Sequence, residues 1–272
     1  MYNLLIALAI SIGLFLAVTA WLGPIPAVIP AVAVFGLAMF LLSRRVSQKV
    51  QPELDQLPAL LEARNIAGAE AVLRKVRNDW GPWQMMLTGQ IDLQLGMLQY
   101  VQRNWDAALP LLEAGSWRNW MGLTCIGSIQ WRKGDKAKAY ESFSKAADAA
   151  PLEGPLYLVW ATLLERDGER EKALKVVDQG LKANAEVPYL VALKNAIANK
   201  RKVDTRTFPA QIWLQFFPED ASQDQIAQMQ AAMTRGRKDG QTPQFQHPRP
   251  AGAPEPTLNR QQRRLAEKNS KS

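Results

Sequence analysis

GDKAKAYESFSKAADAAP at residues 134–151 and GEREKALKVVDQGLKANA at residues 168–185 are two copies of one pattern, 34 residues apart. Each copy begins with a glycine, places a small alanine five residues later and sets a bulky apolar residue four positions beyond: Gly134, Ala139 and Phe143, then Gly168, Ala173 and Val177. Each also follows a stretch with helical apolar periodicity. A fixed period of this length indicates stacked helical repeats, each burying its apolar face against the next.

The pattern of helix, glycine turn and helix at a 34-residue period resembles the tetratricopeptide repeat family. That resemblance implies an all-α solenoid of helix-turn-helix repeats. Packing explains the pattern: small residues, Gly127 with Ala139, let the two helices of a pair approach closely. The turn glycines suit a left-handed backbone conformation, which glycine adopts without steric cost.

Two weaker copies lie upstream, where arginine replaces the turn glycine. One begins at Arg103 and the other at Arg64. The alanine anchors Ala69, Ala108, Ala139 and Ala173 are separated by 39, 31 and 34 residues, so the first two intervals depart from the family's period. Residues 186–199 form either a closing helix or the start of a fifth, incomplete unit. We therefore predict a tetratricopeptide-like solenoid over residues 50–200, with about four repeats plus the closing helix.

The N-terminus has a different composition, because the first charged side chain is Arg44. Two apolar runs, residues 2–21 and 25–42, are each about long enough to cross a bilayer core of roughly 30 Å. Prolines at 24 and 26 break the helix between them. Residues 1–45 are therefore predicted to form a transmembrane helical hairpin that contacts membrane lipid through residues 2–42.

The orientation follows from Arg44, Arg45 and Lys49, which come directly after the second run, whereas the turn carries no lysine or arginine. The positive-inside rule then predicts a multi-pass protein, in a bacterial inner membrane, whose C-terminal domain is cytoplasmic. Two alternatives stay open. The first run could be a signal peptide cleaved after Ala20, although it lacks a basic n-region, or the hairpin could be buried in a soluble protein.

Composition argues against several functional classes. The chain has one cysteine, Cys125, one histidine, His247, and no phosphate-binding loop, nucleophile elbow or zinc-protease motif. We therefore predict no catalytic residues, no metal site and no cofactor, and expect Cys125 to be a buried core thiol. The net charge of +8 is partly concentrated beyond residue 200, which makes nucleic acid an unlikely partner for the repeats.

Residues 201–235 combine an aromatic segment and a short helix. On a helix, Trp213, Phe216 and Phe217 would share one face, and they would either pack onto the last repeat or contact the membrane or a partner. Residues 236–272 are predicted to be a disordered, basic, proline-rich tail. Its end, residues 258–265, could touch anionic lipid or RNA, or remain solvated without binding.

The family resemblance implies a concave groove lined by the first helix of each repeat, where a protein or peptide partner binds. The groove residues implied here are Met97, Tyr100, Ser128, Trp131, Arg132, Thr162 and Arg166. Trp131 could equally be a core residue, and the two arginines could pair with an acidic peptide. The chain is thus expected to be a membrane-anchored interaction scaffold or adaptor, not an enzyme. The alternative is a permanent structural subunit or assembly factor of a membrane complex.

Overall fold

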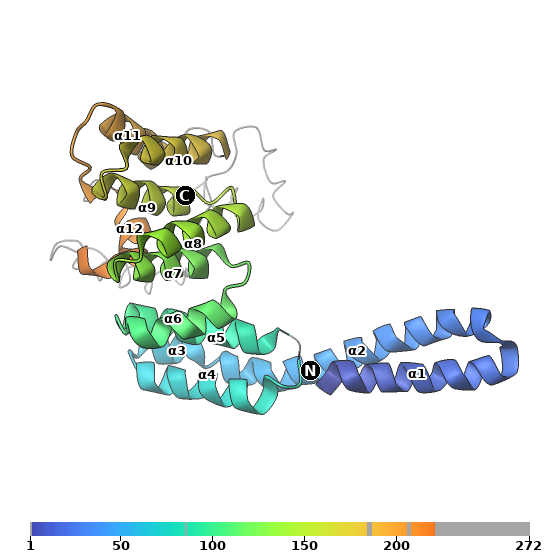
Figure 1. The fold of residues 1–272 in the computed structure, drawn as a ribbon. Helices are drawn as coiled ribbons and strands as arrows, with labels where there is room; N and C mark the ends of the chain where they lie inside the picture. Colours follow the sequence, from blue (N-terminus) through green and yellow to red (C-terminus); the bar gives the residue numbers. More distant parts are fainter. Residues whose placement is uncertain (1, 85, 184–186, 206–207, 221–272) are drawn as a thin grey trace, which may run out of the picture. The chain divides into compact units, whose positions relative to one another are not determined.

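A computed structural model describes residues 2–84, 86–183, 187–205 and 208–220 (Figure 1). This part of the chain is all-α and contains no strand, which confirms the predicted fold class. The helices are α1 Tyr2–Leu22, α2 Pro24–Leu54, α3 Leu57–Glu62, α4 Ile66–Trp80, α5 Leu87–Val101, α6 Trp105–Gly115, α7 Trp120–Arg132, α8 Lys136–Ala149, α9 Gly154–Arg166, α10 Arg170–Ala183, α11 Pro188–Ala198 and α12 Ala210–Phe216, followed by the 3₁₀ turn η2 Pro218–Asp220. The short helix and the tail expected after residue 221 lie outside the described residues.

The middle of the chain is a stack of antiparallel helix pairs. Helix α5 packs on α6, α7 on α8 and α9 on α10, and each pair contacts the next. The first helices α5, α7, α9 and α11 also contact one another in order, so they form one continuous layer. This is the helix-turn-helix solenoid that the repeat pattern predicts, with α3–α4 as its first pair and α11 as its last helix.

One turn geometry recurs at the end of every first helix. A residue with positive φ lies at this point, at Arg64 (φ 55°), Arg103 (62°), Gly134 (85°), Gly168 (83°) and Lys200 (53°). After the first four the second helix begins two residues later, whereas after Lys200 the next described α-helix is α12. The N–H of the positive-φ residue donates to the carbonyl three residues back, and the next N–H donates to the carbonyl five residues back, in all five turns. These two bonds define the Schellman motif, so the upstream copies with arginine are true members of the series.

The uneven repeat lengths have local causes. Between Arg64 and Arg103 the chain needs an additional loop after α4, where Met86 also has positive φ (70°). Between Arg103 and Gly134 the second helix, α6, is only 11 residues long, against 14 for α8 and α10. The insertions and deletions therefore fall outside the turn itself.

Small residues allow the close contacts within each pair. A Cβ atom added to Gly127 would lie 3.1 Å from the Ala139 carbonyl oxygen and 3.0 Å from the Phe143 ring. The Phe143 side chain is fully buried and stacks on Trp160 of the next pair, with ring centroids 6.3 Å apart. Phe143 thus fills the space between two neighbouring pairs.

Helices α1 and α2 pack side by side as an antiparallel hairpin with small residues at the contact. Ala7, Ala27 and Ala31 are buried there, and the Ser11 hydroxyl donates to the Ala31 carbonyl at 2.8 Å. Two helical stretches, Tyr2–Leu22 and Pro24–Glu62, are long and apolar enough to cross a membrane, with mean hydropathy 2.4 and 2.5 in their most apolar windows. The predicted spans, residues 2–21 and 25–42, lie within these two stretches.

The hairpin is continuous with the repeats. Helix α2 runs without interruption through Pro30 and past residue 45, and the predicted boundary between residues 45 and 50 falls inside it. Its last turns place Val46 and Val50 in a core with Leu73 and Val76 of α4 and with Leu87, Ile91 and Leu95 of α5. One helix therefore contributes both to the apolar hairpin and to the first helical layer of the solenoid.

Candidate protein-interaction groove

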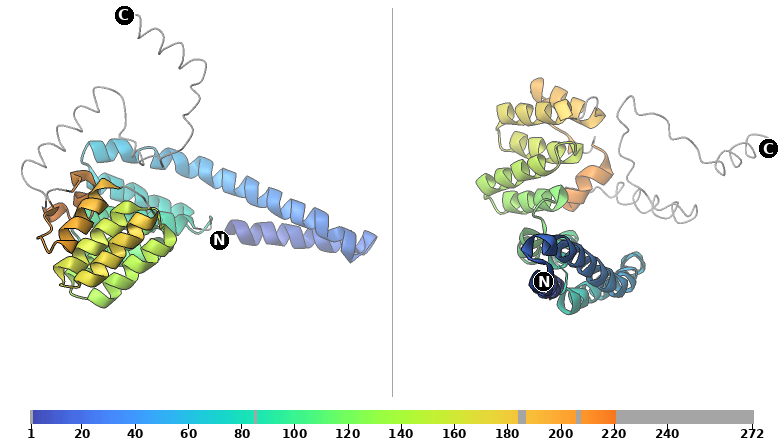
Figure 2. Two further views of the ribbon diagram at one scale, coloured as in Figure 1. Left: turned by 90° about the horizontal axis from the view of Figure 1, so that it is seen from above. Right: turned by 90° about the vertical axis from the view of Figure 1, so that its right-hand side faces the viewer.

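A segment from further along the chain covers part of the layer of first helices. Residues 208–220, which we call the aromatic segment, lie against it, and α12 contacts both α7 and α9 (Figure 2, right). The sequence analysis left packing on the last repeat as one alternative. The segment does contact α9 of that repeat, and it also reaches α7 of the repeat before it. Its helix is two turns long and ends at Phe216, after which Phe217 leaves the helical conformation.

A backbone carbonyl forms the centre of the contact. The Phe216 carbonyl oxygen accepts the Tyr100 hydroxyl at 2.6 Å and the Arg132 Nη2 at 2.7 Å. Arg132 Nη1 also donates to the Tyr100 hydroxyl at 3.1 Å, which aligns the two donors. Burial, opposed in part by the nearby guanidinium, raises the pKa of Tyr100, so the phenol keeps its proton and donates it. These bonds recognise main chain and do not depend on the side chain at 216.

Four aromatic side chains of the segment are buried: Phe208, Trp213, Phe216 and Phe217. The Trp213 and Phe217 rings stack with centroids 4.6 Å apart, and the Phe217 ring meets the Trp131 ring edge-on at 6.3 Å. Arg132 lies over the Phe217 ring, 4.3 Å from its centroid. The groove thus combines apolar contact with cation–π attraction, which is strongest where water is excluded.

Arginines of three successive repeats meet the end of the segment. Arg132 Nη2 lies 2.6 Å from the Glu219 carboxylate, and Arg166 Nη2 lies 3.1 Å from the Asp220 carboxylate. Arg103 Nη2 donates to the Pro218 carbonyl at 3.2 Å. The groove is therefore basic where the segment is acidic.

Four of the seven groove residues implied by the family resemblance meet at this contact: Tyr100, Trp131, Arg132 and Arg166. The contacts of the other three lie within the repeats, and Ser128 lies beside Tyr100 itself. Ser128 and Thr162 are buried, and the Thr162 hydroxyl donates to the Leu158 carbonyl within α9. Met97 is half-buried, and its sulfur faces the buried Cys125 thiol at 3.7 Å. Cys125 is fully buried, which confirms the predicted core thiol.

Several residues of the site were not singled out from the sequence. Trp105 lies under Arg132, Trp120 packs near Phe216, and Asp167 accepts hydrogen bonds from Trp131 Nε1, at 2.9 Å, and from the Tyr140 hydroxyl. Burial opposes ionisation of Asp167, but Lys136, Tyr140 and Trp131 outweigh it and hold its pKa below the ordinary value. Asp167 thus fixes the Trp131 ring that the aromatic segment meets.

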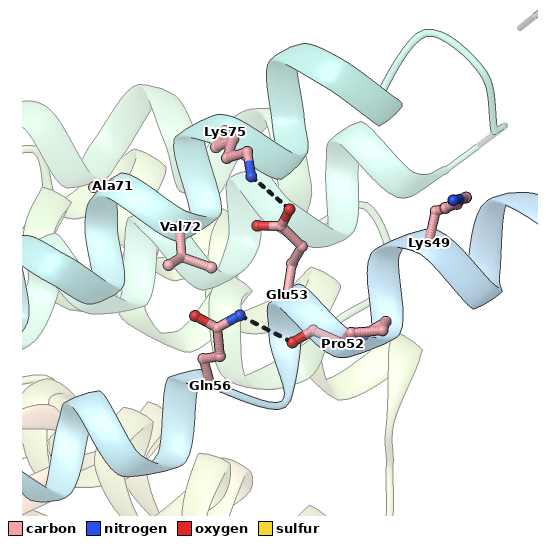
Figure 3. Close-up of a pocket in the computed structure, with 7 residues that line it drawn as sticks. All are labelled: Lys49, Pro52, Glu53, Gln56, Ala71, Val72 and Lys75. Carbon is pink, nitrogen blue, oxygen red and sulfur yellow. Dashed lines mark hydrogen bonds and ion pairs between the residues drawn. The ribbon is translucent and has the colours of Figure 1, made fainter.

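Elsewhere the described surface offers little chemistry. An open pocket between α2 and α4 is lined by Lys49, Glu53 and Lys75 among others, but Lys75 lies 2.5 Å from the Glu53 carboxylate (Figure 3). Its charge is thereby matched within the pocket. No group of three or more His, Cys, Asp or Glu side chains that could hold a metal occurs among the residues whose placement is described.

Comparison with known proteins adds a distant likeness of fold. No protein-family model matches the chain, and no curated protein matches it. Among solved structures, one similar chain is "MamA MSR-1 C2", with 16% sequence identity and a TM-score of 0.41 over 62% of this chain and 92% of that one. The tetratricopeptide-like character of the repeats therefore rests on the helix pairing and the five turns described above.

Proposed function

We propose that this protein is a membrane-anchored interaction scaffold whose repeats face the cytoplasm and hold a peptide segment of a partner protein. The single observation that carries the proposal is the groove on α5, α7 and α9, which already binds a short helical stretch of chain through its backbone, its aromatic rings and its carboxylates. An interface whose core consists of aromatic and arginine side chains is typical of protein recognition.

Anchoring is supported by the exposure of the hairpin. Only 6% and 11% of the residues in its two apolar windows are buried, whereas core helices of soluble proteins are mostly buried. Large apolar side chains such as Leu16, Ile25 and Phe40 lie on the outside, where lipid would cover them. The basic residues after the second span favour a cytoplasmic C-terminal domain.

Topology reporters test the anchor. Fusions of alkaline phosphatase and of a fluorescent protein are made after Leu22, in the turn, and at the C-terminus. We expect phosphatase activity from the turn fusion and fluorescence from the C-terminal fusion. Phosphatase activity of the C-terminal fusion would contradict both the proposed orientation and the proposed cytoplasmic scaffold.

Partner recovery tests the groove. Proteins that co-purify with the detergent-solubilised chain are compared between wild type and the Trp131→Ala/Arg132→Ala variant, with the exposed Gln94→Ala substitution on α5 as a control. We expect the double variant to lose partners that wild type and the control retain. Identical partners in all three would refute a role for the groove. Recovery of a single stoichiometric species would favour a permanent subunit over a transient adaptor.

A further inference from the structure

The occupant of the groove indicates both what kind of partner fits it and how access is controlled. We propose that the groove binds partner peptides carrying an aromatic cluster followed by two carboxylates, and that residues 208–220 occupy it in competition with them. This inference rests on the proposed function, since it names the partner class of the same groove. The chain's own sequence there, Trp213-Leu-Gln-Phe-Phe-Pro-Glu-Asp220, is the pattern that such a partner would present.

The complementarity has three separable parts. The Phe216 carbonyl is held by Tyr100 and Arg132, which any peptide backbone could satisfy. Trp213 and Phe217, stacked on each other, also lie under Arg166 and Arg132, at 5.2 Å and 4.3 Å from their respective ring centroids. The carboxylates pair with the same two arginines. A peptide that lacks aromatic rings or acidic residues would leave these arginines without the ring and carboxylate contacts that the segment supplies, which gives the groove its selectivity.

The two arginines are built into the repeat. Arg132 and Arg166 each stand two residues before a turn glycine, Gly134 and Gly168, and so occupy equivalent positions 34 residues apart. The segment therefore makes the same type of contact with two consecutive repeats. A competing peptide must therefore present one aromatic ring and one carboxylate to each of the two arginines, at the same spacing.

Two features favour displacement of the segment from the groove. Helix α12 has seven residues, and an isolated helix shorter than about 12 residues is marginal in water, so its structure depends on the groove. Residues 199–209 join it to α11, which ends in the last of the five turns. The helix pairs contact one another directly along the stack. Release of the segment therefore uncovers the groove without separating the repeats.

Tethering sets the expected size of the effect. A short connector holds the segment at an effective concentration on the order of millimolar near the groove. A free peptide of similar intrinsic affinity must compete with that concentration, so weakening the internal contact should raise the apparent affinity for the peptide by about tenfold or more.

The test uses the full-length chain in detergent and a fluorescent peptide of residues 208–220, with binding followed by anisotropy. The Trp213→Ala/Phe217→Ala chain, in which the internal segment is weakened, should bind the peptide at least about tenfold more tightly than wild type. The Gln211→Ala chain, altered at an exposed position of the same helix, should behave as wild type. Adding Arg132→Ala/Arg166→Ala to the weakened chain should abolish the gain.

A second peptide, with Gln and Asn in place of Glu219 and Asp220, tests the acidic requirement and should bind the weakened chain about tenfold less tightly. Equal binding of both peptides, or equal binding by weakened and wild-type chains of the same helical content, would overturn the inference. Such a result, with partners still lost from the Trp131→Ala/Arg132→Ala chain, would leave the proposed function standing.

Hydrogen exchange on the wild-type chain provides a measurement that does not depend on a variant folding. Excess peptide should increase exchange in residues 210–217 while α8 and α10 stay protected. Unchanged exchange in residues 210–217 would contradict displacement. The molecular mass in detergent tests a further outcome. If the wild-type chain were a dimer and the weakened chain a monomer, the segment would be exchanged between two copies, and occupation of the groove within one chain would be overturned.

Discussion

The upstream helix pairs, α3–α4 and α5–α6, and the downstream pairs, α7–α8 and α9–α10, use the same turn with different residues. Upstream, Arg64 and Arg103 adopt the left-handed conformation; downstream, Gly134 and Gly168 do. The two backbone hydrogen bonds of the turn are present in each case. A left-handed L-residue costs roughly 1–2 kcal/mol, so the turn forms because the packed helix pair and its hydrogen bonds offset that cost.

The pairs differ more in how closely their helices approach. In the upstream pair α5–α6, a Cβ atom on Gly115 would lie 2.4 Å from the Leu93 backbone nitrogen and 2.5 Å from the Gly89 carbonyl oxygen. In the downstream pair α9–α10, a Cβ atom on Gly180 would meet the Tyr157 side chain, at 2.7 Å. Backbone cannot move aside as a side chain can. The upstream contact is thus the less tolerant of the two.

The largest effect is therefore expected from Gly115→Ala, which must separate α6 from α5. We predict a loss of about 3 kcal/mol in the free energy of unfolding, measured by chemical denaturation in detergent. Gly180→Ala should lose less, about 2 kcal/mol: the atoms it meets, Cγ and Cβ of the buried Tyr157, can shift only a little, but alanine favours the helix. Gly89→Ala is the matched control on α5: its nearest neighbour would be 3.7 Å away. Equal losses at positions 89 and 115 would contradict the backbone clash.

A medium effect is expected at a position where the downstream pairs carry a charge and the upstream pair does not. Asp167 directly precedes the turn glycine of α9–α10, and Gln102 holds the equivalent place before Arg103. Asp167 binds Lys136, Trp131 and Tyr140, whereas Gln102 reaches only back along its own helix to the Leu98 carbonyl in a bond at 3.2 Å. Asp167→Asn should cost about 2 kcal/mol at neutral pH, and Gln102→Asn should cost little.

The pH dependence of that difference has a definite sign. Because the folded-state pKa of Asp167 is lowered, its stabilisation is fully present above the unfolded-state pKa of about 3.9 and is lost as the pH falls through the folded-state value. The gap in unfolding free energy between wild type and Asp167→Asn should therefore close below about pH 4. A gap that stays constant from pH 7 to pH 3 would show that the carboxylate charge contributes nothing.

The sequence was sufficient for the repeats because their cause is local. Glycine turns, small residues and apolar periodicity recur along the chain, and even the arginine-containing copies keep the step of five residues from the turn to the alanine. The groove was only partly predictable. Tyr100, Trp131, Arg132 and Arg166 were implied by the family resemblance, and so were Ser128 and Thr162, which are also on first helices but are buried.

The occupant of the groove could not be placed from the sequence. The aromatic character of residues 208–217 was evident, yet its site depends on contacts between residues 84 and 116 positions apart, such as Arg132 with Phe216 and Tyr100 with Phe216. Periodicity carries no information about such pairings. The one available signal was chemical: arginines and aromatic residues in the implied groove, and aromatic and acidic residues together in the segment.

The smallest effect is expected at the turns themselves. Exchanging the residue types there should change the free energy of unfolding in opposite directions, with a loss at a downstream turn and a gain at an upstream turn. Gly134→Ala places a Cβ atom at φ 85° and should cost about 1 kcal/mol. Arg64→Gly relieves the same conformation at an exposed position and should gain about 0.5 kcal/mol, since part of the relief is offset by the greater freedom of glycine in the unfolded chain. Denaturation midpoints compare both with Ala137→Gly, a substitution inside α8. A loss for Arg64→Gly would mean that the arginine side chain contributes more at this turn than its backbone strain costs, and the upstream turns would then be specified by side-chain contacts as well as by backbone hydrogen bonds.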